Sequence, residues 1–188
     1  MRSVFQIDYG QCVFDAVESK DGVARFRKEV ISEGVWTHPR RGITVNVTPD
    51  RMRRWIEGHE RRSQLGLKTP LPWGHRDDAE ANAGWVESYE VADRPDGRKG
   101  LFAVLAVPRA EDADKLATGT AADTSIWIDQ DTKVSQPDGS VVDLGETIGH
   151  VAITNIPVVS DLSPFERLEY AFDGEEVVEV ISLAREGA

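Results

Sequence analysis

Four histidines and one well-placed serine are the residues of this sequence that are best suited to chemistry. His75 lies in the compact turn Leu-Pro-Trp-Gly-His-Arg-Asp-Asp, where either following aspartate could fix the tautomer of its ring or simply solvate the turn. His150 lies between apolar residues of a predicted strand, so its ring needs a hydrogen-bond partner. Ser125 opens the strand-like stretch Asp-Thr-Ser-Ile-Trp-Ile and faces the same side as Trp127. Considered one at a time, each fits a structural role better than a catalytic one.

The other two histidines and the one cysteine are predicted to be structural. His38, in Trp-Thr-His-Pro ahead of an Arg-Arg-Gly turn, is expected to be an exposed or hydrogen-bonded loop residue. His59 falls seven residues after Met52 and three after Ile56 on a predicted helix, so it should border the apolar face. Cys12 cannot form an internal disulfide, and we interpret it as a small buried hydrophobe in a reducing compartment.

A metal site is the alternative interpretation of part of this set. His75, Asp77, Asp78 and His150 offer imidazoles and carboxylates, which can bind zinc or iron. The sequence contains no His-x-x-x-His, His-x-His or Cys-x-x-Cys spacing, so the pattern is weak. It also lacks phosphate-binding glycine loops and the Gly-x-Ser-x-Gly elbow of α/β hydrolases. We therefore expect neither a metal nor another cofactor.

Composition disfavours several classes of function. The 188 residues carry a formal net charge of −11, which opposes a general attraction to nucleic acid or anionic lipid. Apolar residues make up 40% of the chain, enough to bury a core. The longest apolar run, from Leu101 to Val107, is far shorter than the roughly 20 residues that span a bilayer. The N-terminal stretch does not fit a signal peptide, so the protein is expected to stay inside the cell that makes it.

Many short strands should position these side chains. Turn signals at Pro95-Asp96-Gly97 and Pro137-Asp138-Gly139 predict hairpins, and this density of strands indicates a barrel or sandwich. Stretches with a period near two, rich in β-branched and aromatic residues, predict strands at Val4–Ile7, Val23–Ile31, Ile43–Val47, Gly84–Val91, Leu101–Val107, Thr124–Asp129, Ser140–Leu144, Ile148–Thr154 and Glu176–Leu183.

Capping signals place three helices among these strands. The first begins at Thr48 as N-cap, with Pro49 at the first helical position, and stops near Gly66. A second, shorter helix fits residues 110–117 before Gly119. The third is predicted to start at Ser163, where a glutamate three residues later completes a capping box.

Taken together, the order and spacing of His75, Ser125 and His150 resemble the prohead (capsid maturation) serine proteases of phages and, more distantly, the herpesvirus assemblins. The motifs are Leu-Pro-Trp-Gly-His-Arg-Asp-Asp, Asp-Thr-Ser-Ile-Trp-Ile and Gly-His-Val-Ala-Ile-Thr-Asn-Ile-Pro. Ser125 and His150 are 25 residues apart, and this interval with the His-Val-Ala segment is the most specific part of the match. Upstream, Trp-Thr-His-Pro-Arg-Arg-Gly-Ile followed by Thr-Pro and a helix also looks like the phage branch, so the resemblance covers roughly Gly34 to Leu162.

The resemblance implies a Ser-His-His mechanism. In it Ser125 attacks the scissile carbonyl, His75 takes the serine proton, and His150 orients His75. A serine hydroxyl is a weak nucleophile until a neighbouring base removes its proton, and that base needs a third group to hold its tautomer. Because a neutral imidazole should stabilise the imidazolium less than a carboxylate would, the resemblance implies a slow enzyme.

The resemblance also bears on the oxyanion site and the fold. Assemblins carry an arginine pair shortly after the second histidine, whereas the corresponding stretch here, from Asn155 to Asp161, contains no arginine. The candidate donors in place of those arginines are the backbone amides near Val158 and Val159, or the Asn155 side chain. The fold implied is α+β, a mostly antiparallel β-barrel surrounded by a few helices, in agreement with the predicted elements.

The implied function is a serine endopeptidase that cleaves scaffold and major capsid proteins during phage prohead maturation and processes itself. It would act in the host cytoplasm, inside the prohead, without direct nucleic-acid or membrane contact, and a homodimer is a candidate assembly. The protease domain is expected over residues 1–172, followed by a C-terminal tail at 173–188. The alternative is a catalytically inactive scaffold or capsid-associated module of the same fold.

Overall fold

The computed structural model of this chain describes residues 22–39 and 41–168. The predicted strands Val4–Ile7 and Glu176–Leu183, Cys12, and the tail at 173–188 lie outside the described residues. In chain order the described elements are β1 (Ala24–Ser32), β2 (Gly34–Thr37), β3 (Thr44–Val47), α1 (Pro49–Gln64), β4 (Thr69–Pro72), the short 3-10 helix η1 (Ala79–Ala81), β5 (Asn82–Asp93), β6 (Lys99–Val107), α2 (Ala110–Ala117), β7 (Asp123–Ser135), β8 (Val141–Thr154) and β9 (Glu166–Leu168).

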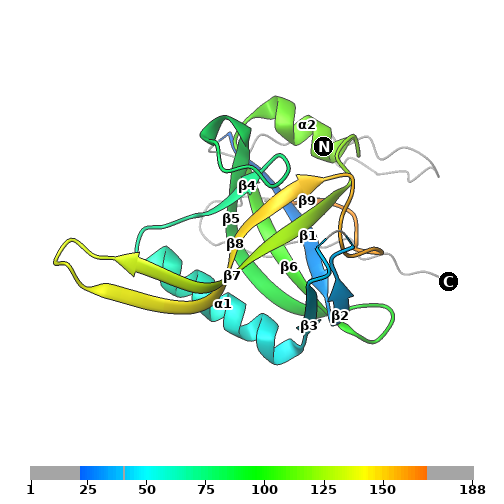
Figure 1. The fold of residues 1–188 in the computed structure, drawn as a ribbon. Helices are drawn as coiled ribbons and strands as arrows, with labels where there is room; N and C mark the ends of the chain where they lie inside the picture. The colour runs from blue at the N-terminus through cyan, green and yellow to red at the C-terminus, as the bar shows by residue number, and fades with distance from the viewer. Residues whose placement is uncertain (1–21, 40, 169–188) are drawn as a thin grey trace, which may run out of the picture.

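The strands form one larger sheet and two ribbons (Figure 1). The larger sheet has five strands in the order β4-β5-β6-β1-β9, and the ribbons pair β2 with β3 and β7 with β8. All of these strand pairs are antiparallel. The predicted α+β class with mostly antiparallel strands is confirmed, and the strand pairs of the described residues do not form a closed barrel.

The core is centred on strand β6, which lies between β5 and β1. Seven of its nine residues are buried. Because neighbouring side chains of a strand point to opposite faces, both faces of the sheet are covered at this strand. Phe26 of β1 pairs with Leu105 of β6, and both are fully buried. Helix α1 adds Met52 and Trp55, each fully buried, to the same core. The long apolar run of the sequence is thus the central strand.

The first two predicted helices are confirmed. Thr48 caps α1 by accepting a hydrogen bond from the Arg51 amide at 3.2 Å, and Pro49 is the first helical residue. Gly66 follows the helix with φ of 78°, a left-handed conformation that favours glycine and ends the helix. Helix α2 ends in the same way before Gly119, whose φ is 73°.

The third predicted helix is wrong. The backbone amide and hydroxyl of Ser163 both donate to Glu29 Oε2, at 2.8 and 3.0 Å, so this serine does not cap a helix of its own. Glu166, which was predicted to complete the capping box, is the first residue of β9, which pairs with β1. The serine that could have capped a local helix is instead hydrogen-bonded to a buried carboxylate of the distant strand β1. Sequence spacing does not reveal that contact.

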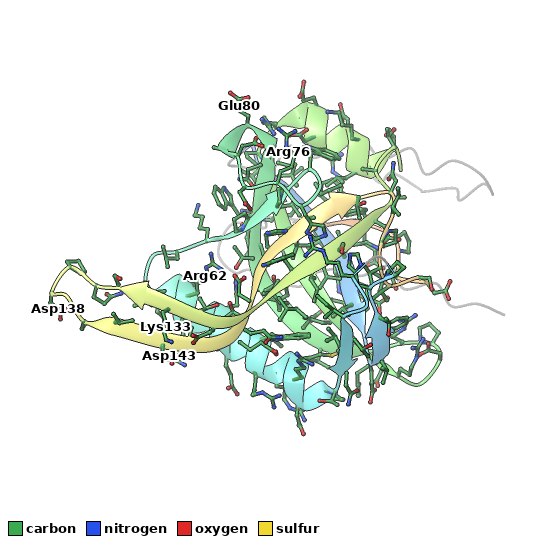
Figure 2. The ribbon with its side chains drawn as sticks, viewed as in Figure 1. Arg62, Arg76, Glu80, Lys133, Asp138 and Asp143 are labelled. Carbon is green, nitrogen blue, oxygen red and sulfur yellow. The ribbon has the colours of Figure 1, made fainter. Side chains whose placement is uncertain are left out.

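Strands β7 and β8 form one long hairpin around Pro137-Asp138-Gly139, as the turn signal predicted. Two strands predicted separately at 140–144 and 148–154 are a single strand, β8, and β7 extends further than predicted. The distal half of the hairpin projects past α1, and Figure 2 shows Lys133, Asp138 and Asp143 along it. Glu146 anchors this half to α1, because it accepts hydrogen bonds from Trp55 Nε1 and Arg51 Nε, both at 2.8 Å.

The proximal half of the hairpin contacts the larger sheet at two places, after β4 and at β1. At the first, β8 makes an isolated parallel bridge between Ile153 and Trp73, directly after β4. At the second, Asp123 at the start of β7 pairs with Lys28 of β1, with 2.9 Å between Oδ1 and Nζ. These contacts bring the turn after β4 beside β7 and β8, and this is where the predicted site residues meet.

Candidate active site

His75, Ser125 and His150 come from three separate segments and form one continuous series of hydrogen bonds. His75 Nε2 lies 3.1 Å from Ser125 Oγ, and His75 Nδ1 lies 2.7 Å from His150 Nε2. Ser125 is the third residue of β7, His150 lies on the paired strand β8, and His75 lies in the turn after β4. The structure therefore brings together three residues that the sequence separates.

Backbone hydrogen bonds fix the turn that carries His75. The Gly74 amide donates to the carbonyl of Ile153 at 2.8 Å, which ties the turn to β8. Gly74 has φ of 69°, so a residue without a side chain is favoured where the chain reverses. Asp78 caps η1 by accepting from the Ala81 amide at 2.8 Å, and its carboxylate also pairs with Arg76, labelled in Figure 2. Asp78 therefore holds the turn and does not hydrogen-bond the His75 ring.

The geometry is consistent with one direction of proton donation. For the Ser125 hydroxyl to donate to His75, Nε2 of His75 must be unprotonated. The ring proton then lies on Nδ1 and is donated to His150 Nε2, so His150 carries its own proton on Nδ1. In this arrangement every hydrogen bond of the series has one donor and one acceptor.

Both imidazoles favour the neutral form. Burial lowers the pKa of His75 below its ordinary value, and its electrostatic interactions with the Arg41 guanidinium and with His38 lower it further. Burial, followed by the neighbouring His75, also lowers the pKa of His150, while the carboxylates of Asp77 and Asp129 oppose this. At neutral pH, His75 is therefore an unprotonated ring that can accept a proton.

Trp127 forms an aromatic wall beside the two rings. Its indole stacks on His150 with centroids 6.1 Å apart and an interplanar angle of 14°, and it lies 6.2 Å from the His75 ring. The indole is itself fixed, because Nε1 donates to Asp129 Oδ1 at 2.8 Å. Gly149 leaves room for that carboxylate, since a Cβ there would lie 2.4 Å from Asp129 Oδ2. These contacts limit the rotation of the imidazole of His150.

A cleft of about 750 Å³ opens against the two imidazoles. Its lining includes Trp127 and Arg41 together with Pro70, Pro72 and Trp85. Ser125 is 8% exposed and contacts the cleft through its hydrogen bond to His75, which is one of the lining residues.

The candidate oxyanion donors lie in the segment that follows β8. The Asn155 side chain braces two loops, because Oδ1 accepts from the Ala122 amide at 3.0 Å and Nδ2 donates to the Thr120 carbonyl at 3.2 Å. Val158 is half-buried and Val159 is buried. Within the described part of the chain, neither valine amide has a hydrogen-bond partner. The valine amides are thus free to donate, whereas the Asn155 side chain already holds the loop ahead of Ser125.

The two remaining histidines are structural. His38 lies in the turn between β2 and β3, where its Nδ1 accepts from the Arg41 amide at 3.2 Å, as predicted for a loop histidine. His59 was predicted to border the apolar face of its helix, but it is more deeply buried than that, with only 6% exposure. Its ring nitrogens bond Thr69 Oγ1 at 3.1 Å and the Glu87 carbonyl at 3.2 Å, so the ring is satisfied within the protein.

Two neighbours of the site were not identified as site residues in the sequence. Trp127 had a signal, because it is two residues after Ser125 on the same face of a strand. No sequence signal could place Arg41 at the site, because it comes from the turn between β2 and β3. Its guanidinium carbon lies 5.3 Å from the centre of the Trp127 ring.

The alternative metal site has no counterpart in the described structure. Residues 22–39 and 41–168 include no group of three His, Cys, Asp or Glu side chains placed to hold a metal ion.

Comparison with known proteins adds no assignment. No family model, curated protein or solved structure matches this chain. Within the described residues, no helix is both long enough and apolar enough to cross a membrane.

Replacing Arg41 with alanine is expected to raise the pKa of His75. The guanidinium opposes protonation of the ring, so its removal makes the imidazolium easier to form. The measurement is an NMR titration of the His75 ring in the wild type and the variant. Arg76→Ala is the matched control, because Arg76 lines the same cleft but is paired with Asp78. A pKa of His75 that is unchanged in Arg41→Ala, or that moves equally in both variants, would contradict this electrostatic role.

Proposed function

We propose that the protein is a serine endopeptidase in which Ser125 is the nucleophile, His75 is the general base and His150 orients His75. The observation that carries this proposal is the unbroken series of contacts from Ser125 Oγ to His75 Nε2, at 3.1 Å, and from His75 Nδ1 to His150 Nε2, at 2.7 Å. Both distances allow hydrogen bonds, and both lowered pKa values favour the neutral rings that the mechanism needs.

The proposed reaction proceeds in two stages. In the first, Ser125 Oγ bonds to the carbonyl carbon of the scissile peptide while its proton passes to His75 Nε2. The tetrahedral intermediate then breaks its C–N bond, and His75 gives that proton to the leaving amine, which leaves an ester on Ser125. In the second stage, His75 takes a proton from water, the resulting hydroxide attacks the ester, and the proton returns to Ser125 as the acid product leaves.

His150 supports the base as a neutral partner. It accepts the Nδ1 proton of His75 and so holds the tautomer in which Nε2 faces the serine. When His75 becomes positively charged, a neutral imidazole stabilises it less than a carboxylate would. The proposed enzyme is therefore slow, which suits a protease that meets concentrated substrate inside a closed shell.

Negative charge on the intermediate needs donors, and the amides of Val158 and Val159 are the proposed ones. Their hydrogen-bonding capacity is unused within the described residues. Backbone amides fixed near a nucleophile stabilise an oxyanion without arginine. The segment that carries them is held at its start by Asn155, which bridges to the loop ahead of Ser125.

The proposed substrates are the scaffold and major capsid proteins of a phage prohead, with self-processing in the same particle. This part rests on the three motifs that resemble prohead proteases. We also propose a barrel of the assemblin type, completed by the β7–β8 hairpin between β4 and β1. Its support is the bridge from Ile153 to Trp73, after β4, and the pair of Lys28 with Asp123, at β1.

A serine-directed fluorophosphonate probe tests the proposed function. Native protein is expected to be labelled on Ser125, as located by mass spectrometry of its peptides, because the probe reacts only with an activated serine. Heat-denatured protein and the Ser125→Ala variant should not react, whereas Ser135→Ala, which changes an exposed serine of the same strand, should react normally. A folded wild type that remains unlabelled would overturn the proposal and favour an inactive scaffold module.

A further inference from the structure

Lys28 of strand β1 is a cation that lies entirely inside the protein. Its side chain has 0% exposure, and its Nζ lies 2.9 Å from Asp123 Oδ1 and donates to the carbonyl of Ser163. The Phe165 ring adds a cation–π contact, with its centroid 5.3 Å from Nζ. Burial lowers the pKa of the Lys28 ammonium, and the Asp123 carboxylate opposes that effect. A buried charge is tolerated when it has such partners.

Both polar partners of Lys28 flank the proposed catalytic residues. Asp123 is the first residue of β7, two residues before Ser125, and its Oδ1 also accepts the Thr124 amide at 3.0 Å. Ser163 lies beyond the candidate oxyanion amides, in the segment that connects β8 to β9. One buried ammonium group therefore joins the start of the nucleophile strand and the end of the oxyanion segment to strand β1.

A second buried pair fixes the same segment from the other side. Glu29 Oε2 accepts the amide and hydroxyl of Ser163, and Glu29 Oε1 lies 3.1 Å from Arg94 Nη1. Arg94 also donates to the Asp161 carbonyl at 2.8 Å. Gly100 leaves the room that this carboxylate needs, since a Cβ there would lie 2.6 Å from Oε1. The segment after β8 is thus anchored at two of its residues by buried charged groups.

Stability alone does not explain a fully buried lysine at this position. An apolar side chain of similar length would fill the same space without the cost of removing an ammonium group from water, and such replacements are often neutral or stabilising. An ion pair with two directed contacts instead fixes where its partners lie. Here those partners are the two segments whose relative placement the proposed reaction requires.

We infer that Lys28 is a positioning residue of the proposed peptidase, which holds Asp123 and Ser163 so that Ser125 Oγ faces both His75 and the oxyanion amides. This inference rests on the proposed function. The inference extends the proposed function by assigning a role to Lys28, which touches neither the substrate nor the side chains of the three hydrogen-bonded residues.

The double variant Lys28→Met/Asp123→Asn tests this role, because it removes both charges and nearly preserves side-chain size. The rate constant for fluorophosphonate labelling is expected to fall about 10- to 100-fold, the loss typical of reacting groups displaced by about 1 Å. The fraction of molecules finally labelled should equal that of the wild type. Irreversibly unfolded protein would instead lower the labelled fraction. Reversible unfolding would lower the rate constant only in proportion to the folded fraction, so circular dichroism must show that the variant is folded at the labelling temperature.

The matched control is Arg51→Met/Glu146→Gln, which removes another partly buried ion pair, with 2.6 Å between Nη2 and Oε2. This pair joins α1 to the distal half of β8, away from Ser125. We expect the control to lower the melting temperature and to leave the labelling rate constant unchanged. If the Lys28 double variant does not fold, the single variant Asp123→Asn takes its place in the labelling experiment. In that variant Lys28 keeps the Ser163 carbonyl as a hydrogen-bond partner, so folding is less affected.

The outcomes separate the two proposals. A labelled wild type with equally fast labelling of the folded double variant, or of Asp123→Asn, would overturn the positioning role and leave the proposed function intact. A folded but unlabelled wild type would overturn the proposed function itself, and the role of Lys28 with it. A slower rate constant at full labelled fraction, absent from the control pair, supports the role.

Discussion

Cleavage of protein substrate is expected to fall by about 10⁴-fold or more when Ser125 is replaced with alanine, because the proposed reaction has no nucleophile without it. In the described part of the chain, Ser125 is the one hydroxyl that is hydrogen-bonded to His75 Nε2. Its small side chain is 8% exposed, so the change to alanine removes one oxygen and little packing. The measurement is the rate of peptide release from a mixture of denatured proteins, followed by mass spectrometry.

Ser135→Ala is the control for this experiment. Ser135 is exposed at the far end of the same strand, so its replacement should leave both folding and cleavage unchanged. Thermal unfolding of all three proteins establishes that they are equally folded. Cleavage by Ser125→Ala at close to the wild-type rate would show that another group attacks the substrate, and would exclude the proposed nucleophile.

The second large effect is expected at His75. His75→Ala removes the base that takes the serine proton, so the loss should approach that of Ser125→Ala, about 10⁴-fold or more. His150→Ala removes only the partner of His75 Nδ1 while nucleophile and base remain. The loss in this variant is expected to be roughly 10 to 100 times smaller than at Ser125. The measurement is kcat/KM for the same cleavage reaction in each variant.

His59→Gln provides the matched histidine control. His59 is buried and bonded to Thr69 and Glu87, outside the site, so its replacement should lower stability without changing kcat/KM per folded molecule. Equal losses at His75, His150 and Ser125 would contradict the ranking and the purely orienting role of His150. A His75→Ala variant with wild-type activity would exclude His75 as the base.

Much of the fold followed from local patterns in the sequence. The helix after Thr48 and the two hairpin turns were predicted correctly, because caps and turns depend on residues within a few positions of one another. The helix at Ser163 was wrong for the complementary reason. Its capping serine bonds Glu29, a residue 134 positions away, and no local pattern reports that contact.

The members of the candidate site were proposed from the sequence, whereas their geometry comes from the structure. His75, Ser125 and His150 were selected from motifs and spacing, and the pairing of β7 with β8 then places Ser125 opposite Ala152, two residues from His150. The approach of His75 depends on the bridge between Ile153 and Trp73, a tertiary contact. Arg41 reaches the same region from the turn between β2 and β3, and Lys28 reaches it from β1; both approaches are tertiary contacts that the sequence does not specify.

By itself, the sequence determined the chemistry that is available, one suitably placed hydroxyl with two imidazoles, and most of the strands and helices that carry it, because side-chain type and periodicity are local properties. Only the tertiary structure decided which groups meet. Burial in the folded protein lowers the pKa of His75 and of His150. The fold also sets the distance of 3.1 Å from Ser125 to His75 and of 2.7 Å from His75 to His150, and it places Ser163 against the buried carboxylate of Glu29. Distances and burial depend on contacts between segments that are far apart in the chain, and residue order alone does not specify them.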